Sequence, residues 1–245
     1  MTSSAHCRTN ALLIVAAGSG SRAGQSLPKQ YVPVGGVPLL RHPVLRGLRH
    51  QGIGSVRVVI GAGQQELHDA ALGDLDLPPP VIGGQTRQQS VFNGLRALAD
   101  MEEPPDNVLI HDAARPFLPA AVIDRLLAAL QQHEAVIPVL EVVDTIKRVD
   151  EHGIIVETPP RHRLRAAQTP QAFRFRPILQ AHDAAARLPV EFSDDAAVAE
   201  HAGLRVATVA GDAILRKVTH PQDFRWAENM ARTLAAEGKS DDAGV

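Results

Sequence analysis

Three glycines with a nearby arginine and lysine follow the first apolar run of the chain. They are Gly18, Gly20 and Gly24, with Arg22 between them and Lys29 further on. Glycines let backbone N–H groups approach an anion closely, and cations offset charge that builds on a departing pyrophosphate. The loop therefore suits a triphosphate, although it lacks the G-K-[ST] ending of a Walker loop. The alternative is a flexible turn that carries solvated charges.

A second charged stretch, His111–Pro116, follows another apolar run. A carboxylate at Asp112 can bind Mg²⁺ where a nucleotide phosphate would lie, and Arg115 can bind a second anion. The alternative is that Asp112 caps a turn and pairs with Arg115. Lys217 is one of four lysines in the chain, and it fits either an anion contact or an exposed surface lysine.

Several other polar residues leave two interpretations open. The glycines before Thr86 could approach a base or a ribose, or Thr86 could simply cap a helix. Thr145 could donate to a phosphate or be an ordinary strand threonine. The basic cluster around Arg161 could be a solvated face, or it could deliver an arginine to a partner subunit. Asp194 and Asp195 are interpreted as a helix cap, where acidic residues favour the helix dipole.

An alternating series of strands and helices must position these residues. Continuous apolar or β-branched runs predict strands over Ala11–Ala16, Val56–Ile60, Val81–Ile82, Asn107–Ile110, Ala135–Leu140 and Leu204–Val209. Apolar residues at helical spacing predict helices over Pro38–His50, Gln64–Leu72, Thr86–Leu98, Ala120–Leu130, Pro177–Arg187, Asp194–Ala202 and Pro221–Leu234. The alternation predicts an α/β fold, a Rossmann-like mostly parallel sheet with helices on both faces. Ligands of such sheets bind at the carboxyl ends of strands, where the charged stretches lie.

The pattern changes late in the chain. Asp144–Val149 and Gly153–Glu157 are short and β-branched with a turn between them, which predicts a hairpin. An isolated hairpin is marginal in water, so we expect this β-arm, about residues 141–166, to pair with a second subunit. The single domain is expected over residues 11–236, with flexible tails at 1–10 and 238–245.

Composition excludes several classes of protein. The 245 residues are 44% hydrophobic and 21% charged, as in folded globular proteins. The net charge of −2 and the lack of a dominant basic stretch make nucleic-acid binding unexpected. No run of about 18 apolar residues predicts a membrane span, and no secretory signal opens the chain, so we expect a cytoplasmic protein. The single cysteine, Cys7, excludes an internal disulfide framework.

Six motifs, in their order and spacing, carry a more specific signal than the first loop alone. They are Ala16–Arg22, Pro28–Tyr31, His111–Pro116, Asp144–Lys147, Ala167–Phe173 and Lys217–Thr219. Together they make the chain resemble the 2-C-methyl-D-erythritol 4-phosphate cytidylyltransferase family over about residues 11–230. One departure is Leu164-Arg165, where the family often has Leu-Trp.

The resemblance implies a nucleotide-diphospho-sugar transferase fold and a homodimer joined through the β-arm. It implies transfer of a cytidylyl group from CTP to methylerythritol phosphate, with release of pyrophosphate, in the non-mevalonate isoprenoid pathway. The implied catalytic residues are Arg22, Lys29, Arg161 and Lys217. The implied CTP contacts are Ala16, Ala17, Gly18, Gly20, Gly84, Arg87, Ser90 and Asp112. The implied methylerythritol phosphate contacts are Asp112, Arg115, Thr145, Lys217 and, from the partner's arm, Arg161 or Arg163. Asp112 would also bind Mg²⁺ or another divalent cation.

Other functions fit part of the pattern. A cytidylyltransferase for another polyol phosphate, such as ribitol 5-phosphate, could use the same loop and the same His111–Pro116 stretch. A non-catalytic nucleotide-binding regulatory module is a third interpretation, which the presence of Arg22 and Lys29 disfavours. Some family members are fused to a cyclodiphosphate synthase. This chain ends before such a domain, so we expect either a stand-alone enzyme or a piece of a fused one.

Overall fold

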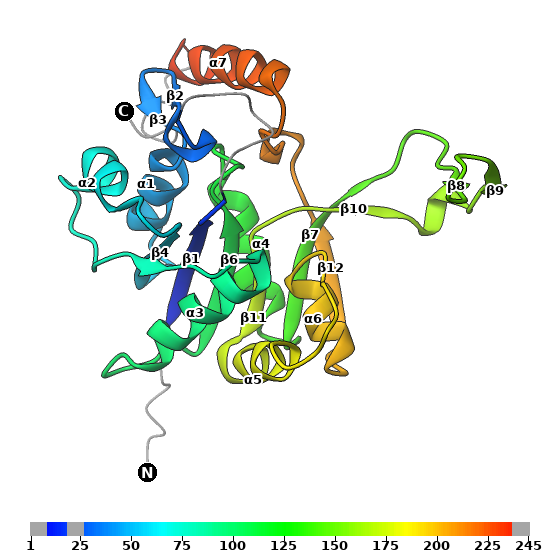
Figure 1. Ribbon diagram of the computed structural model, residues 1–245, viewed down its shortest axis with the longest axis horizontal. Coiled ribbons are helices and arrows are strands. Elements are labelled where there is room, and N and C mark those ends of the chain that lie inside the picture. The colour runs from blue at the N-terminus through cyan, green and yellow to red at the C-terminus, as the bar shows by residue number, and fades with distance from the viewer. Residues whose placement is uncertain (1–8, 19–26, 237–245) are drawn as a thin grey trace.

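The computed structural model describes residues 9–18 and 27–236. The predictions for Gly20 and Arg22, and those for tail residues 1–8 and 238–245, lie outside this part. The described chain forms a central sheet with helices on both faces and an arm that projects from one side (Figure 1). The predicted α/β architecture is therefore confirmed.

The first half of the sheet is parallel and centred on β1 (Asn10–Ala16). Its neighbours are β4 (Ser55–Ile60) on one side and β6 (Asn107–Asp112) on the other, and β5 (Val81–Ile82) lies beyond β4. The sheet therefore begins within the segment predicted to be a tail, since Asn10 is already paired with Asn107.

The second half of the sheet contains two antiparallel strands. They are β10 (Arg165–Ala167) and β11 (Gln171–Arg174), and β11 lies between β6 and β7 (Ala135–Glu141). Strand β12 (Val206–Ala210) pairs with β7 in parallel. The sheet is thus mostly parallel, as predicted, but the sequence pattern assigned no strand to β10 or β11.

Helices cover the two faces of the sheet because successive residues of a strand point to opposite sides. In β1, Leu12 and Ile14 pack into one buried cluster, and Ala11 and Leu13 pack into the other. The first face is covered by α1 (Arg41–Arg49), α2 (Gln65–Leu72) and α4 (Ala120–Ala129). The second is covered by α3 (Arg87–Ala99), α5 (Phe175–Ala185) and α6 (Asp195–His201).

A third cluster joins the C-terminal helix to a small hairpin. Helix α7 (Pro221–Ala236) packs on β2 (Pro33–Val34), which pairs with β3 (Val37–Pro38). Gly35 and Gly36 form the connecting turn with positive φ values of 61° and 80°, as a tight hairpin turn requires. The helix predicted from Pro38 consequently begins only at Arg41. Short 3₁₀ helices lie at Lys29–Tyr31, Arg161–Arg163 and Ala213–Leu215.

The arm leaves the sheet at the end of β7 and returns at β10 (Figure 1). Its tip is an antiparallel pair, β8 (Arg148–Val149) and β9 (Ile155–Glu157). The predicted hairpin is present, but its strands are shorter than predicted, because residues 144–147 have no strand partner. Within residues 9–18 and 27–236, none of the helices is both long and apolar enough to cross a bilayer.

Candidate active site

A pocket of about 420 Å³ opens at the carboxyl ends of β1 and β6. The chain runs from β1 outward to β4 and β5 and then returns to β6 on the other side of β1. This is a topological switch point, where open α/β sheets bind their ligands. The lining residues include Val15 to Gly18, Lys29, Gln30, Gly84 to Arg87, Ser90, Asp112 to Ala114 and Lys217.

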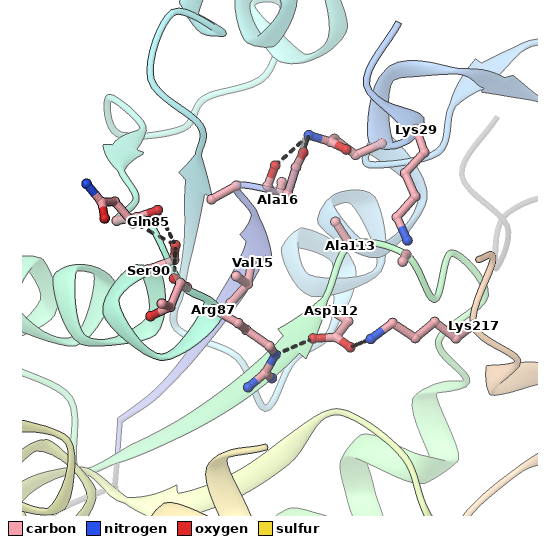
Figure 2. A pocket seen from close by; sticks show the side chains of 15 residues that line it. Val15, Ala16, Lys29, Gln85, Arg87, Ser90, Asp112, Ala113 and Lys217 are labelled. Carbon is pink, nitrogen blue, oxygen red and sulfur yellow. Dashed lines mark hydrogen bonds and ion pairs between the residues drawn. The ribbon is translucent and has the colours of Figure 1, made fainter. Parts of the chain in front are cut away.

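Asp112, the last residue of β6, lies between two cations (Figure 2). Lys217 Nζ donates to Asp112 Oδ2 at 2.6 Å, and Arg87 Nε donates to Asp112 Oδ1 at 3.1 Å. Burial would raise the pKa of the Asp112 carboxyl, but the charges of Arg87 and Lys217 outweigh burial and hold that pKa well below its usual range. Asp112 is therefore ionised at neutral pH, and its carboxylate can bind a cation.

A smaller pocket of about 190 Å³ shares Arg87, Asp112 and Lys217 with the larger one. Its other lining residues are polar almost throughout: Arg115, Ala167, Gln168, Thr169, Gln171, Ser193 and Asp194. Two ligands that occupy the two pockets would therefore meet at Asp112 and its two cations.

Side-chain hydrogen bonds fix the backbone of the larger pocket. The buried Gln30 amide Nε2 donates to the Ala16 carbonyl at 2.6 Å and to the Gly18 carbonyl at 2.9 Å. Because C=O and N–H point in opposite directions across a trans peptide, these bonds turn the N–H of Ala17 away from Gln30. On the other side, Ser90 Oγ accepts from the Gly84 N–H at 3.1 Å.

The segment that carries Lys217 is held by residues from both pockets. The Gln168 side-chain amide donates to the Asp212 carbonyl at 2.8 Å and accepts from the Asp212 N–H at 3.0 Å. Arg115 donates to the Leu215 carbonyl at 2.6 Å, and Lys29 donates to the Val218 carbonyl at 3.0 Å. The position of Lys217 thus depends on side chains that come from three other parts of the sequence.

Comparison with known proteins decides the family. The family model described as 2-C-methyl-D-erythritol 4-phosphate cytidylyltransferase matches residues 10–233. The chain belongs to this cytidylyltransferase family. The family resemblance predicted from the six motifs is therefore confirmed.

The curated relatives of the chain include proteins that are named as bifunctional enzymes. The chain is 53% identical to the "Bifunctional enzyme IspD/IspF" of Rhizorhabdus wittichii over 227 residues, which are 92% of this chain and 57% of that protein. It is 48% identical to the protein of the same name from Rhodopseudomonas palustris (strain BisB18), over 94% of this chain and 58% of that protein. The chain therefore spans little more than half the length of these relatives.

Solved structures support the fold of the chain. The 2-C-methyl-D-erythritol 4-phosphate cytidylyltransferase from Thermus thermophilus superposes with a TM-score of 0.72 at 35% identity, over 91% of this chain and 99% of that one. The 4-diphosphocytidyl-2C-methyl-D-erythritol synthase from Anaerococcus prevotii gives a TM-score of 0.80 at 26% identity, over 92% and 99% of the two chains.

Most of the described residues predicted to act in the site lie together. The larger pocket is lined by Ala16, Ala17, Gly18, Lys29, Gly84, Arg87, Ser90, Asp112 and Lys217, and Arg115 lines the smaller one. Thr145 and Arg161 are exposed residues of the arm and line neither pocket of their own chain. The predicted cation Arg22 lies outside the described residues.

The structure bears on several of the alternative interpretations. Asp112 forms its ion pairs with Arg87 and Lys217 rather than with Arg115, so Lys217 is not simply an exposed lysine. Thr86 does cap α3, by accepting from the Gln89 N–H. The interpretation of the two acidic residues at the start of α6 is half wrong: Asp194 is the cap, whereas Asp195 is buried against Arg87.

The resemblance also implies a divalent cation at Asp112. Among residues 9–18 and 27–236 no cluster of three or more His, Cys, Asp or Glu side chains could hold a metal. Each Asp112 oxygen accepts one side-chain hydrogen bond, which leaves lone pairs for a further ligand. Mg²⁺ is commonly bound by one or two carboxylates together with substrate phosphates. The donor set therefore fits a cation that arrives with a nucleotide.

Sequence reasoning missed the residues that position Asp112. Thr169 Oγ accepts from the Asp112 N–H at 3.1 Å and lies 3.0 Å from His111 Nδ1. His111 Nε2 lies 2.9 Å from the Arg115 carbonyl, so Nε2 donates there and Nδ1 accepts from Thr169. Burial lowers the pKa of His111 to about 4 and keeps the ring neutral. The motif Ala167–Phe173 contains Thr169 and was part of the family resemblance, but it did not suggest that Thr169 positions Asp112.

Proposed function

We propose that the chain transfers a cytidylyl group from CTP to 2-C-methyl-D-erythritol 4-phosphate. An oxygen of the acceptor phosphate attacks the α-phosphorus of CTP, the bond to the β-phosphate oxygen breaks, and pyrophosphate leaves with the electron pair. The products are 4-diphosphocytidyl-2-C-methyl-D-erythritol and pyrophosphate. No protein nucleophile is required, because the acceptor oxygen is already anionic.

The junction of two pockets at Asp112, Arg87 and Lys217 is the observation that carries this proposal. A transferase must hold two anionic substrates in contact although their phosphates repel each other. Positioning two reactants together can supply about 7–11 kcal/mol of a barrier. A pair of adjoining pockets with cations at their boundary suits that task, whereas a regulatory module needs only the first pocket.

The cations divide according to the pocket that they line. Lys29 lines only the larger pocket, where it would bind the triphosphate and stabilise the departing pyrophosphate together with Arg22. Arg115 lines only the smaller pocket and would bind the acceptor phosphate. Lys217 lines both, so it is suited to the phosphorus under attack. Ser90, Gly84 and the Ala16 to Gly18 backbone would hold the nucleoside.

A divalent cation, usually Mg²⁺, would be held by Asp112 together with the nucleotide phosphates. When bound, it would neutralise phosphate charge during the displacement. Asp112 itself contributes a fixed carboxylate, and the chain of Thr169 and His111 contacts holds the Asp112 backbone in place.

The protein would act as a homodimer joined through the β-arm. The arm exposes large apolar side chains, with exposed fractions of 77% for Val143, 63% for Ile154 and 58% for Ile155. Clustered apolar exposure of this kind marks interaction surfaces. In the dimer, Thr145 and Arg161 of one subunit would complete the acceptor pocket of the other.

Pyrophosphate release tests the proposal directly. The protein is incubated with CTP and Mg²⁺ and, in parallel, with methylerythritol phosphate, ribitol 5-phosphate or no acceptor. We expect pyrophosphate release only in the reaction that contains methylerythritol phosphate as the acceptor. Pyrophosphate release only with ribitol 5-phosphate would overturn the substrate assignment but keep the mechanism. No pyrophosphate release in any of the reactions would favour a non-catalytic nucleotide-binding module.

A further inference from the structure

Asp195 is a buried carboxylate, and a helix-capping role does not explain its burial. It is the first residue of α6, and its side chain is only 1% exposed. Asp194 already caps this helix by accepting from the Ala197 N–H at 2.9 Å. A buried carboxylate is costly unless it is paired and hydrogen-bonded, so the partner of Asp195 indicates its role.

That partner is Arg87, and the pair is bidentate. Arg87 Nη1 donates to Asp195 Oδ1 at 3.1 Å, and Nη2 donates to Oδ2 at 2.8 Å. The third nitrogen, Nε, donates to Asp112 Oδ1 at 3.1 Å. All three nitrogens of the planar guanidinium thus bind carboxylates, and the fork fixes the plane as well as the position of the group.

The start of α6 is itself anchored to the sheet. Gln171 of β11 donates to Asp194 Oδ2 at 2.8 Å and accepts from the Ala196 N–H at 2.8 Å. The fully buried His182 ring of α5 lies near Asp195, with Nε2 3.5 Å from Oδ1. The residues on either side of Asp195 are therefore anchored to β11, so Asp195 can fix a side chain that bonds to it.

Charge also distinguishes Asp195 from a packing residue. Asp112 and Asp195 carry two negative charges, and Arg87 and Lys217 carry two positive charges. Burial would raise the pKa of Asp195, but the Arg87 charge outweighs burial and keeps that pKa below its ordinary value. Asp195 balances the positive charge of Arg87 and occupies both of its terminal nitrogens. The guanidinium therefore donates to Asp112 through the Nε–H alone.

We propose that Asp195 is a positioning residue: it holds the terminal nitrogens of Arg87 so that Nε–H orients the Asp112 carboxylate at the junction of the two pockets. The inference rests on the proposed cytidylyl transfer, because Asp112 matters only if a reaction takes place there. Asp195 itself lines neither pocket, so its effect must pass through Arg87.

The test begins with Asp195→Asn in the full chain. We expect kcat for pyrophosphate release to fall on the order of 10- to 100-fold. The dissociation constant of CTP, measured by calorimetry without acceptor, should change by less than about threefold, because Asp195 is not at the nucleoside contacts. The matched control is Asp74→Asn. Asp74 forms a similar bidentate pair with Arg41, at 2.5 and 2.6 Å, and lines neither pocket.

A double-mutant cycle separates positioning from a structural effect. If Asp195 acts through Arg87, the kcat of Arg87→Gln should not fall further when Asp195→Asn is added. Additive losses, a wild-type kcat in Asp195→Asn, or equal losses of kcat and CTP binding would each overturn the inference. The wild-type protein is assayed first: if it releases no pyrophosphate, the proposed function fails, whereas an active wild type with an unaffected Asp195→Asn variant refutes the positioning role alone.

Discussion

Arg87 and Lys217 at the pocket junction, and Lys29 in the larger pocket, differ in the groups that they contact. Arg87 is fixed by two carboxylates, and Lys217 is paired with Asp112. Lys29 donates to the neutral carbonyl of Val218, while its side chain points toward the cavity (Figure 2). Arg87 and Lys217 face carboxylates of opposite charge, whereas the Val218 carbonyl carries no net charge. In the proposed reaction, the Lys29 ammonium would bind the triphosphate in the larger pocket.

Lys29→Ala should therefore affect the chemical step more than the fold. We expect kcat for pyrophosphate release to fall on the order of 100- to 1,000-fold, the usual cost of removing a group that stabilises developing charge. Steady-state kinetics with CTP, Mg²⁺ and methylerythritol phosphate measure the change. Arg232→Ala, an exposed position of α7, is the control. Near-normal turnover in a folded Lys29→Ala protein would contradict the proposed role.

The sequence revealed the residues that contact a ligand better than those that position them. Lys29, Asp112 and Lys217 stand out because charged residues beside strand ends have few structural reasons to be there. Asp195 resembles a helix cap in the sequence, and its partner Arg87 lies 108 residues away. Gln30 is equally inconspicuous, because the carbonyls that it binds become its partners only in the folded chain.

At the scale of elements, long apolar runs were predictable and short inserted strands were not. β1, β4, β6 and β7 are buried on both faces, so their sequences are continuous apolar runs. β11 has only four residues, and its antiparallel place between β6 and β7 depends on a chain that leaves the sheet as the arm and returns. No local pattern encodes that path.

Another element whose placement matters is α7, which begins just after Lys217. Asp223 in its first turn accepts from the backbone N–H groups of Thr219 and His220, at 2.9 and 2.8 Å, and from Arg216 at 2.6 Å. Its side chain is 7% exposed. This carboxylate therefore joins the helix to the segment that carries Lys217, where a negative charge also favours the helix dipole.

Asp223→Asn should lower the free energy of unfolding by about 2 kcal/mol at pH 7, since hydrogen bonds to charged groups contribute about that much. Burial raises the pKa of Asp223, but the two N–H groups and Arg216 outweigh it and lower the pKa. The stabilisation is thus complete above the unfolded pKa of about 3.9 and is lost as pH falls toward the folded value.

Urea unfolding of Asp223→Asn and wild type between pH 3 and 8 measures this difference. The gap should be constant above about pH 5 and shrink below about pH 4. Asp183→Asn is the control, because its pair with Arg187 is a surface pair within α5 and the following turn, and exposed pairs contribute little. A gap that widened on acidification would contradict the assigned sign.

At the scale of the whole molecule, the proposed homodimer predicts that a single chain lacks part of its acceptor pocket. Thr145 and Arg161 belong to the segment between β7 and β10, and this arm projects away from the body of its own chain (Figure 1). Arg161 Nη1 donates to the Val143 carbonyl at 2.7 Å, which holds the base of the arm together. A second copy related by two-fold symmetry would meet the same surface of the first, because such an interface is isologous. Each dimer would then hold two composite sites.

Composite sites predict complementation between two inactive variants. Lys29→Ala and Arg161→Ala chains are each expected to have little activity alone. In a mixed dimer, one site combines Lys29 from one subunit with Arg161 from the other, and the second site lacks both. Equal mixing makes about half of the dimers mixed, so about one quarter of wild-type activity should return.

Differently tagged chains, mixed and co-purified, show whether subunits have exchanged, and pyrophosphate release then reports the recovered activity. If Arg161 served the pocket of its own chain, every site in the mixture would lack one of the two cations and no activity would return. Absence of recovery in a sample with proven exchange would therefore place the whole site within one subunit, and the exposed apolar residues of the arm would need another partner.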